Sequence, residues 1–313
     1  MRALVTGANG FVGRYLQQRL REREYEVVTA GRTGERTDVL LELNDDASVR
    51  AAVEQAAPDL VFHLAAQTFV PQAYDDPIDT YETNVVGTAR LLDAIVRYRA
   101  RAGTDPKVIY VSSAQVYGRG NELHGALRET DPPSPAEPYA ASKAAAEQVC
   151  IAAVHAYGLN LVIARAFNHI GPGQDERFVI SSFARQLARI VAGAEEPRIE
   201  VGNLEAERDF LDVRDVVEAY ITLARNGARG EVYNVCSGNL LKIKTMLRML
   251  ILAANLPVQV IEDPEKMRPV DVPQFYGDNT KLCALGWSPK ISIADSVREI
   301  YESALREIAA AVS

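Results

Sequence analysis

A glycine-rich turn between the first apolar run and the first helical stretch constrains the fold most. The run leads directly into Gly7, Gly10 and Gly13, which have the spacing GxxGxxG. Gly7 permits a tight turn, Gly10 lets the backbone approach a pyrophosphate, and Gly13 lets the helix pack closely against the strand. The helix that starts here presents its positive end to an anion. The turn therefore predicts a dinucleotide site, which includes Phe11 and Val12.

The alternation of short β-branched runs and longer amphipathic stretches continues to about residue 165. The apolar runs are Arg2–Thr6, Glu26–Thr29, Leu60–His63, Val108–Ser112 and Asn160–Arg165. The helical stretches are Val12–Arg23, Ser48–Ala56, Ile78–Arg101 and Glu137–Tyr157. Parallel βαβ units produce this pattern, and helices of this length cover both faces of a sheet. We predict an α/β fold with a doubly wound parallel sheet of the Rossmann type.

A second, smaller and discontinuous domain is predicted from the change of pattern after Arg165. The segments FNHIGPGQ and VGNLEAERDF are rich in Gly, Asn and charge, which is typical of loops, and they surround a helix at Val179–Ala192. A further helix and strand, Val213–Arg225 and Val232–Val235, are expected to return to the large sheet. The predicted domains are residues 1–165 with 209–236 for the cofactor, and residues 166–208 with 237–313 for the substrate.

Charge and composition exclude several classes of partner. The formal net charge of −8 argues against binding to nucleic acid or to an anionic membrane. Cys150, Cys236 and Cys283 lack CxxC spacing, so the sequence predicts neither a disulfide framework nor a metal site. No apolar run approaches the ~20 residues of a membrane span, and the chain opens in an apolar strand instead of a charged leader. We expect a cytoplasmic protein.

The choice of cofactor depends on the residue about 20 positions beyond the last glycine of the turn. An NAD-specific site has a carboxylate there for the ribose, whereas this chain reads Ala30-Gly31-Arg32-Thr33. Arg32 suits the 2′-phosphate of NADP(H). The alternative is a solvated arginine on a loop, so NAD(H) stays open.

Tyr139 and Lys143 stand four residues apart in PYAASK, at the start of a predicted helix, so they share one helix face. The charge of Lys143 is expected to lower the pKa of Tyr139, which leaves a phenol able to exchange a proton with a hydroxyl or a carbonyl group. Ser113 ends the strand in IYVSSAQVYG, where its hydroxyl can bind the reacting oxygen. These three residues are the catalytic candidates.

The motifs TGANGFVG, HLAAQ, NVVGT, SSAQVYG and YAASK together resemble the extended short-chain dehydrogenases/reductases, along essentially the whole chain. The resemblance implies that His63 and the following Leu64, Ala65 and Ala66 line the nicotinamide side, and that Asn84 supports the cofactor pocket. It also implies that Glu42 and Leu43 lie near the adenine, although Glu42 as an ordinary surface acid is equally plausible. Homodimers packed through residues 78–101 and 137–157 are usual in this family.

If the substrate is linked to a nucleoside diphosphate, an acidic protein needs local positive charge to bind it. Arg208 in LEAERDF and Arg268 in MRPVDVP are candidates, since either can form charge-assisted hydrogen bonds to phosphate or ribose. The alternative is that they pair with nearby acids, Asp209 or Asp271. Spacing alone does not decide between the two.

The later segments FNHIGPGQ, VGNLEAERDFLDVRD, YNVCSG and RPVDVPQFYGDNTKLCALGW resemble the branch of GDP-mannose 4,6-dehydratases and GDP-4-keto-6-deoxymannose reductases. This resemblance implies a GDP-linked substrate. It places Asn168 at the phosphates, Val179 and its helix at the guanosine, Asn203 and Arg208 at the nucleotide, and Arg268 and Asp271 at the ribose and diphosphate.

The two residues after Ser113 separate the possible reactions. Dehydratases of this group have a carboxylate pair, or a hydroxyl and a glutamate, at these positions, because removing a proton beside a ketone requires a base. This chain has Ala114 and Gln115, and an amide is no base at neutral pH. Gln115 is expected at the substrate, with local packing as the alternative.

We therefore expect NADPH-dependent reduction of the 4-ketone of GDP-4-keto-6-deoxy-D-mannose to a GDP-6-deoxyhexose, GDP-D-rhamnose being preferred over GDP-6-deoxytalose. A dTDP- or UDP-linked substrate stays open. The alternative enzymes are a GDP-mannose 4,6-dehydratase and a nucleotide-sugar 4-epimerase. The alternative that is not an enzyme is a dinucleotide-binding redox sensor. Such proteins commonly lack the tyrosine or the lysine that correspond to Tyr139 and Lys143.

Overall fold

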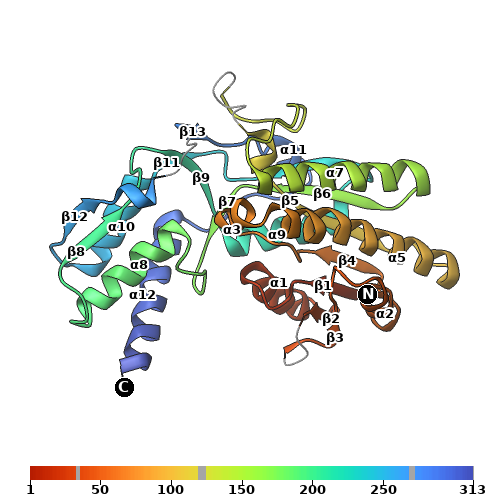
Figure 1. The fold of residues 1–313 in the computed structure, drawn as a ribbon, viewed down its shortest axis with the longest axis horizontal. Helices are drawn as coiled ribbons and strands as arrows, with labels where there is room; N and C mark the ends of the chain where they lie inside the picture. Colours follow the sequence, from red (N-terminus) through yellow and green to blue (C-terminus); the bar gives the residue numbers. More distant parts are fainter. Residues whose placement is uncertain (33–35, 119–124, 268–271, 313) are drawn as a thin grey trace.

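A parallel sheet of seven strands organises the larger lobe of the computed structural model (Figure 1). The structure describes residues 1–32, 36–118, 125–267 and 272–312. From edge to edge, the strands are β3 (Val39–Leu40), β2 (Glu26–Gly31), β1 (Arg2–Thr6), β4 (Leu60–His63), β5 (Lys107–Ser113), β6 (Leu161–Ala166) and β10 (Val232–Val235). The chain builds one half of the sheet outward from β1 and the other outward from β4, which is the doubly wound order. The predicted Rossmann fold is confirmed.

Helices cover both faces of this sheet. On one face lie α2 (Asp46–Ala56), α5 (Gly87–Ala102) and α7 (Pro138–Tyr157), and on the other lie α1 (Phe11–Glu22) and α9 (Val213–Asn226). Each layer buries its own apolar cluster against the strands. The result is a three-layer sandwich with the sheet in the middle.

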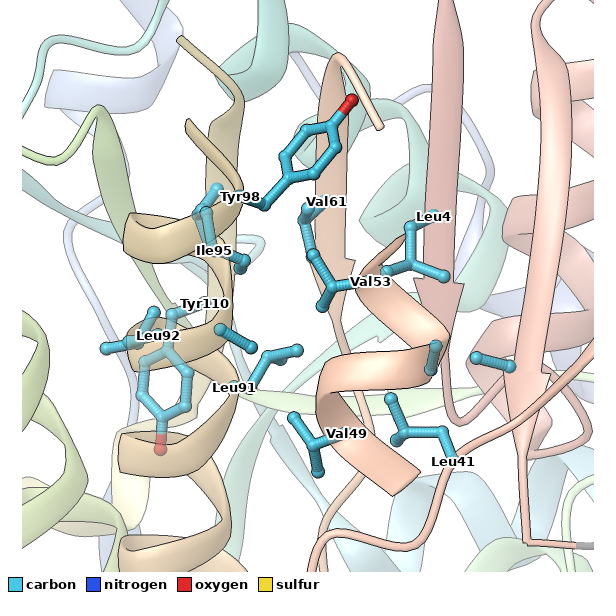
Figure 2. Close-up of a cluster of buried hydrophobic side chains, with 14 of the residues drawn as sticks. Leu4, Leu41, Val49, Val53, Val61, Leu91, Leu92, Ile95, Tyr98 and Tyr110 are labelled. Atoms are coloured by element: carbon cyan, nitrogen blue, oxygen red, sulfur yellow. The ribbon is translucent and has the colours of Figure 1, made fainter. Parts of the chain in front are cut away.

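Aliphatic side chains fill the face beneath α2 and α5 (Figure 2). Leu4 of β1 and Val61 of β4 pack with Val53 of α2 and Ile95 of α5, and all four are fully buried. A sheet covered on both faces needs apolar residues at consecutive positions, as in LVFH of β4. Burying one such side chain contributes about 1.5–3 kcal/mol, so this core holds the strand ends rigidly.

Among the described residues, the smaller lobe has two small sheets and three α-helices. One sheet has the order β11 (Leu240–Lys242), β9 (Glu207–Asp212) and β13 (Gln274–Phe275), with β7 (Asn168–Ile170) also paired to β9, and the other joins β12 (Gln259–Glu262) to β8 (Arg198–Val201). The helices are α8 (Val179–Val191), α10 (Ile243–Ala254) and α12 (Ile293–Val312). Their apolar faces form a separate core around Phe183, Leu187, Leu250 and Ile300.

The chain enters the smaller lobe after β6, returns to the large sheet with α9 and β10, and then leaves it again. The predicted boundary at residue 209 falls inside β9, whose partners β7, β11 and β13 belong to the small sheet. The division into two domains remains a prediction.

The predicted helix at Ile78–Arg101 is interrupted. It consists of α4 (Pro77–Tyr81), a π-helical turn η2 (Glu82–Val86) and then α5. The apolar periodicity continues across the wide turn, which is why the sequence pattern does not reveal it.

The expectation that FNHIGPGQ and VGNLEAERDF are loops is wrong in part, because they contain β7 and the first part of β9. The charged residues of this segment suggested that it is exposed to solvent, yet Asp209 and Asp212 of β9 are fully buried. Asp209 accepts hydrogen bonds from the N–H groups of Ser237 and Gly238, and Asp212 caps α9. Internal donors thus replace water around these carboxylates.

In the described ranges, no helix is both long and apolar enough to cross a bilayer. The same ranges hold no group of three or more His, Cys, Asp or Glu side chains that could bind a metal ion. The three cysteines are free thiols.

Candidate active site

The turn between β1 and α1 has the backbone geometry of a pyrophosphate cradle. Gly7 has a φ of +67°, and a Cβ atom there would stand 2.9 Å from the backbone nitrogen of Ala65. A Cβ atom at Gly13 would stand 2.3 Å from the carbonyl oxygen of Gly7. α1 begins after Gly10 without a side-chain cap, so its first N–H groups remain for an anion. These features fit a dinucleotide.

The residues that complete this turn connect it to both lobes. Val12 packs against the apolar cluster beneath α1 and α9. The Phe11 ring stacks on His169 of β7, with ring centroids 6.1 Å apart and planes 6° from parallel. A Cβ atom at Gly171 would stand 3.4 Å from the Phe11 ring. The cofactor turn therefore touches the first segment of the smaller lobe.

Leu64, Ala65 and Ala66 follow β4 and begin beside the turn. Ala65 donates its N–H to Thr6 Oγ1 (3.1 Å), and the same oxygen lies 2.9 Å from His63 Nδ1. Burial and, to a smaller extent, the charge of Lys143 lower the pKa of His63 to about 3, so the ring is neutral. This segment lies where the strand order reverses between β1 and β4, the usual ligand position in open α/β sheets.

Asn84 of η2 is buried and links two segments of the site. Its side-chain amide accepts a hydrogen bond from Gln67 N (2.8 Å) and donates to Gln67 O and to Ser142 Oγ (both 2.9 Å). Ser142 Oγ donates in turn to the carbonyl oxygen of Tyr139 (2.7 Å). Asn84 therefore couples the segment after β4 to the first turn of α7.

Three further cofactor candidates lie at the ends of β2 and β3. Leu43 is buried, and a Cβ atom at Gly87 would stand 2.8 Å from its Cβ. Glu42 Oε1 accepts a hydrogen bond from Asn44 N (3.1 Å). Arg32 follows β2 and is exposed, and it makes no ion pair with any residue that the structure describes.

The structure brings Ser113, Tyr139 and Lys143 together where β5 ends and α7 begins. The hydroxyl group of Ser113 lies close enough to that of Tyr139 to influence its pKa. Lys143 Nζ donates to the carbonyl oxygen of Val111 (2.8 Å) and lies 5.2 Å from the centroid of the Tyr110 ring. Tyr139 is 8% exposed and Lys143 4%, so both groups work in a nearly dry site.

Burial raises the pKa of Tyr139 to about 12, while the nearby hydroxyl group of Ser113 acts in the opposite direction. The expected lowering by Lys143 is wrong for this structure, because the ammonium is directed to the Val111 carbonyl and the Tyr110 ring. Burial also lowers the pKa of Lys143 to about 8. A phenol with a raised pKa is protonated at neutral pH and can donate a proton to a ketone oxygen.

Gln115 lies in the short 3₁₀ helix η3 (Ala114–Tyr117) that follows Ser113. Its backbone N–H donates to Ser113 Oγ (3.2 Å). Its side-chain Oε1 is buried and accepts no hydrogen bond from the described residues. Buried polar atoms usually have a partner, so a ligand group that donates a hydrogen bond fits this position.

The small sheet places two of the substrate candidates on neighbouring strands. Asn168 of β7 pairs with β9, and its Nδ2 donates to the carbonyl oxygen of Asp209 (3.2 Å). Arg208 lies on β9, and its Nη1 donates to the carbonyl oxygens of Glu207 (2.8 Å) and Val272 (2.7 Å). The carboxylate of Asp209 is taken by other donors, in Ser237 and Gly238.

The remaining substrate candidates lie near these strands or outside the described residues. Val179 begins α8 and is 37% exposed. Asn203 follows β8, and its Oδ1 accepts a hydrogen bond from Glu205 N (3.0 Å). Arg268 and Asp271 fall outside the residues that the structure describes.

Of a buried row of polar residues at the ends of four strands, sequence reasoning found His63 and missed the other three. The row consists of Thr6, His63, Ser112 and Arg165, from β1, β4, β5 and β6. Each faces α5 or α7 or a neighbour in the row, and Ser112 and Arg165 share Glu147 of α7 as a partner. A charged residue inside the apolar run LVIARA was the available indication, since a buried arginine requires a carboxylate.

Comparisons with known proteins agree with this geometry. A family profile described as GDP-mannose 4,6 dehydratase matches residues 4–300. The chain is 40% identical to a GDP-6-deoxy-D-mannose reductase of Pseudomonas aeruginosa, over 98% of this chain and 99% of that protein. It is 32% identical to a GDP-6-deoxy-D-talose 4-dehydrogenase of Aggregatibacter actinomycetemcomitans, over 98% and 99%.

Solved structures of similar fold also belong to NAD(P)-dependent enzymes. A Pseudomonas aeruginosa structure described as RMD complexed with NADPH superimposes with a TM-score of 0.88 at 38% identity, over 98% of this chain and 100% of that one. A UDP-glucose 4-epimerase of Thermus thermophilus in complex with NAD has a TM-score of 0.85 at 30% identity, over 97% and 99%. These relatives are NAD(P)-dependent oxidoreductases or epimerases with one shared fold. The chain belongs to the GDP-mannose 4,6-dehydratase family of the extended short-chain dehydrogenases/reductases.

Proposed function

We propose that the chain reduces the 4-ketone of GDP-4-keto-6-deoxy-D-mannose with NADPH, and that the product is GDP-D-rhamnose. The observation that carries the proposal is the surroundings of Ser113: a protonated Tyr139 on one side, and the amide of Gln115 where a dehydratase needs a carboxylate. Similarity to a GDP-6-deoxy-D-mannose reductase supports the same substrate.

The catalytic residues then have distinct tasks. Ser113 and Tyr139 bind the ketone oxygen through their hydroxyl groups. When bound, NADPH supplies the hydride that the ketone carbon accepts. Tyr139 transfers its proton to the oxygen. Lys143, one helical turn further along α7, stays bound to the carbonyl oxygen of Val111. The orphan Oε1 of Gln115 accepts a hydrogen bond from a sugar hydroxyl.

The cofactor contacts follow from the positions described above. We assign the pyrophosphate to the turn, the 2′-phosphate to Arg32, the adenine to the segment after β3, and the nicotinamide to the segment after β4 and Asn84. The cofactor set is Gly7, Gly10, Phe11, Val12, Gly13, Arg32, Glu42, Leu43, Leu64, Ala65, Ala66, Asn84, Tyr139 and Lys143. NAD(H) is the secondary cofactor.

We assign the GDP moiety to the smaller lobe. The assigned residues are Asn168, Val179, Asn203, Arg208, Arg268 and Asp271. The guanidinium of Arg208 already reaches two carbonyl oxygens at the junction of β9 and β13, so it is held at a strand junction. A fixed guanidinium recognises phosphate at a lower entropic cost than a mobile one.

The decisive assay follows NADPH absorbance with GDP-4-keto-6-deoxy-D-mannose as substrate and identifies the product by NMR. We expect stoichiometric NADPH consumption and the rhamno configuration at C4. The talo product would correct the stereochemistry alone, whereas no oxidation of NADPH would refute the reaction. Incubation with GDP-mannose is expected to give no 4-keto product.

Competition binding tests the nucleotide. GDP should bind more tightly than UDP or dTDP, and Arg208→Ala should weaken GDP while leaving NADPH binding unchanged. The matched control is Arg198→Ala, an exposed arginine of the same lobe that pairs with Glu196. Equal affinity for the three nucleotides would refute the guanosine assignment.

An epimerase is the second candidate, since a UDP-glucose 4-epimerase of Mycolicibacterium smegmatis is 32% identical over 96% of the chain. Tight co-purification of the cofactor would favour epimerisation, and free exchange of NADPH favours reduction.

We further propose a cytoplasmic homodimer packed through the helices at residues 78–101 and 137–157. Exposed apolar side chains on these helices, Ile78, Val86 and Tyr157, support this interface. Light scattering of Ile78→Arg should report a monomer.

A further inference from the structure

Glu147 and Arg165 form an ion pair inside the larger lobe. Arg165 Nη2 lies 2.7 Å from Glu147 Oε2, and its Nε donates to Oε1 (3.0 Å). The side chains are 0% and 5% exposed. The guanidinium also lies 4.6 Å from the centroid of the Tyr117 ring. A pair of this kind is costly to bury, so its position is informative.

The pair is connected to the proposed catalytic residues at two points. Tyr139, Lys143 and Glu147 are spaced four apart on α7, so the carboxylate follows the ammonium along one helix face. Ser112 Oγ donates to Glu147 Oε1 (2.5 Å), and Ser112 directly precedes Ser113. One carboxylate therefore holds the end of β5 and stands one helical turn from Lys143.

Several titratable or charged groups surround Lys143. They are Tyr139, Glu147 and Cys150 from α7, Tyr110 from β5 and His63 from β4, and Arg165 of β6 is paired with Glu147. His63 is neutral, as described above. Burial raises the pKa values of Tyr110, Tyr139 and Cys150, so these groups are uncharged at neutral pH. The charges left around Lys143 are those of Glu147 and Arg165.

We propose that Glu147 is a positioning residue of this active site: its carboxylate keeps Lys143 protonated and holds the strand end that carries Ser113, and Arg165 limits the negative charge that Lys143 experiences. The protonation of Lys143 is thus set by a pair that touches no substrate. Without the carboxylate, burial, which lowers the pKa of Lys143, is opposed less.

The test measures the titration of Lys143 directly. The chain has seven lysines, so ¹³C labelling of lysine gives few Cε signals, and Lys143→Met assigns the one of interest. We expect Glu147→Gln to lower the midpoint pH of the Lys143 titration by about one unit, and Arg165→Met to raise it. The matched control is Gln148→Ala, an exposed residue of the same helix, which should leave the midpoint unchanged.

Glu147→Gln leaves a buried arginine without its partner and can fail to fold. The double variant Glu147→Leu with Arg165→Met removes both charges, and we expect it to fold and to show a lowered midpoint. A wild-type midpoint in the double variant, or shifts of the same sign in the two single variants, would overturn the proposal.

The inference rests on the proposed function only for its consequence in catalysis. The alkaline limb of NADPH oxidation should move in the direction of the Lys143 midpoint in each variant. Because the NMR titration needs no substrate, a wrong substrate assignment leaves the first result intact.

Discussion

The two faces of the seven-stranded sheet are built differently. Beneath α5 and α7, the polar row of Thr6, His63, Ser112 and Arg165 occupies the carboxyl ends of the strands. Beneath α1 and α9, the corresponding end is apolar and includes Phe62. Successive residues of a strand point to opposite faces, so one strand serves both. The comparison teaches that the buried polar network is confined to one face, while the other face is packed with apolar side chains. Ser113, which follows Ser112 in β5, points away from the polar row.

Tyr139→Phe tests this division with the largest expected effect. Loss of the phenolic proton should reduce kcat about 10³-fold, while the ring remains and the melting temperature changes little. Steady-state NADPH oxidation and calorimetry are the measurements. Tyr233→Phe is the control on the other face, since Tyr233 packs in the apolar cluster there and its hydroxyl accepts a hydrogen bond from Ala228 N (3.1 Å). Turnover by Tyr139→Phe at the wild-type rate would contradict the catalytic assignment.

Leu16→Ala tests the apolar face. Leu16 of α1 is fully buried, so its truncation should reduce the free energy of unfolding by about 3 kcal/mol. Urea denaturation measures this loss. We expect kcat at 25 °C to stay within about two-fold of the wild type, because the variant is still folded at that temperature and its active site is unchanged. A large loss of kcat in the folded variant would show that the two faces are not independent.

Asn84→Ala should affect both stability and cofactor binding, since Asn84 joins two segments of the site. The N–H of Gln67 and the hydroxyl of Ser142 lose a partner, which costs about 1–3 kcal/mol of stability. A rise in KM for NADPH should accompany this loss. Asn226→Ala removes a comparable hydrogen bond on α9, to Leu285 O, and should leave KM unchanged.

Arg32→Asp has the smallest expected effect. It should change the preference between NADPH and NADH while the protein stays folded. Removing a cation at the 2′-phosphate should shift the ratio of kcat/KM values toward NADH by about tenfold, or 1.4 kcal/mol. Arg36→Asp, a second exposed arginine nearby, is the control. An unchanged ratio in Arg32→Asp would exclude the assignment.

The larger lobe was predictable because its rules are local. The glycine turn, the apolar runs and the helix of PYAASK each follow from neighbouring residues, and the structure places them within a residue or two of the predicted bounds. Ser113 and Tyr139 meet because parallel strands end at one edge of the sheet. No long-range information was needed for these elements.

The remaining features depend on contacts between distant residues. Asp209 lies in a buried strand because Ser237 and Gly238 supply its donors, and nothing near it in the sequence shows this. The pKa of Tyr139 was predicted in the wrong direction, because burial raises it and the ammonium of Lys143 is directed to the Val111 carbonyl oxygen. Glu147 could have been found from its spacing after Lys143, together with Arg165 in an apolar run.

The π-helical turn η2 has a consequence for motion. Hydrogen bonds in a π-helix span five residues and have poorer geometry than those of an α-helix, so Glu82–Val86 should open more readily than α5. Asn84 lies in this turn and its side chain bonds both Gln67 and Ser142, so we expect opening of the turn to loosen both contacts. We expect the amides of this turn to exchange with deuterium sooner than those of α5, and the exchange to slow when a dinucleotide occupies the neighbouring segment.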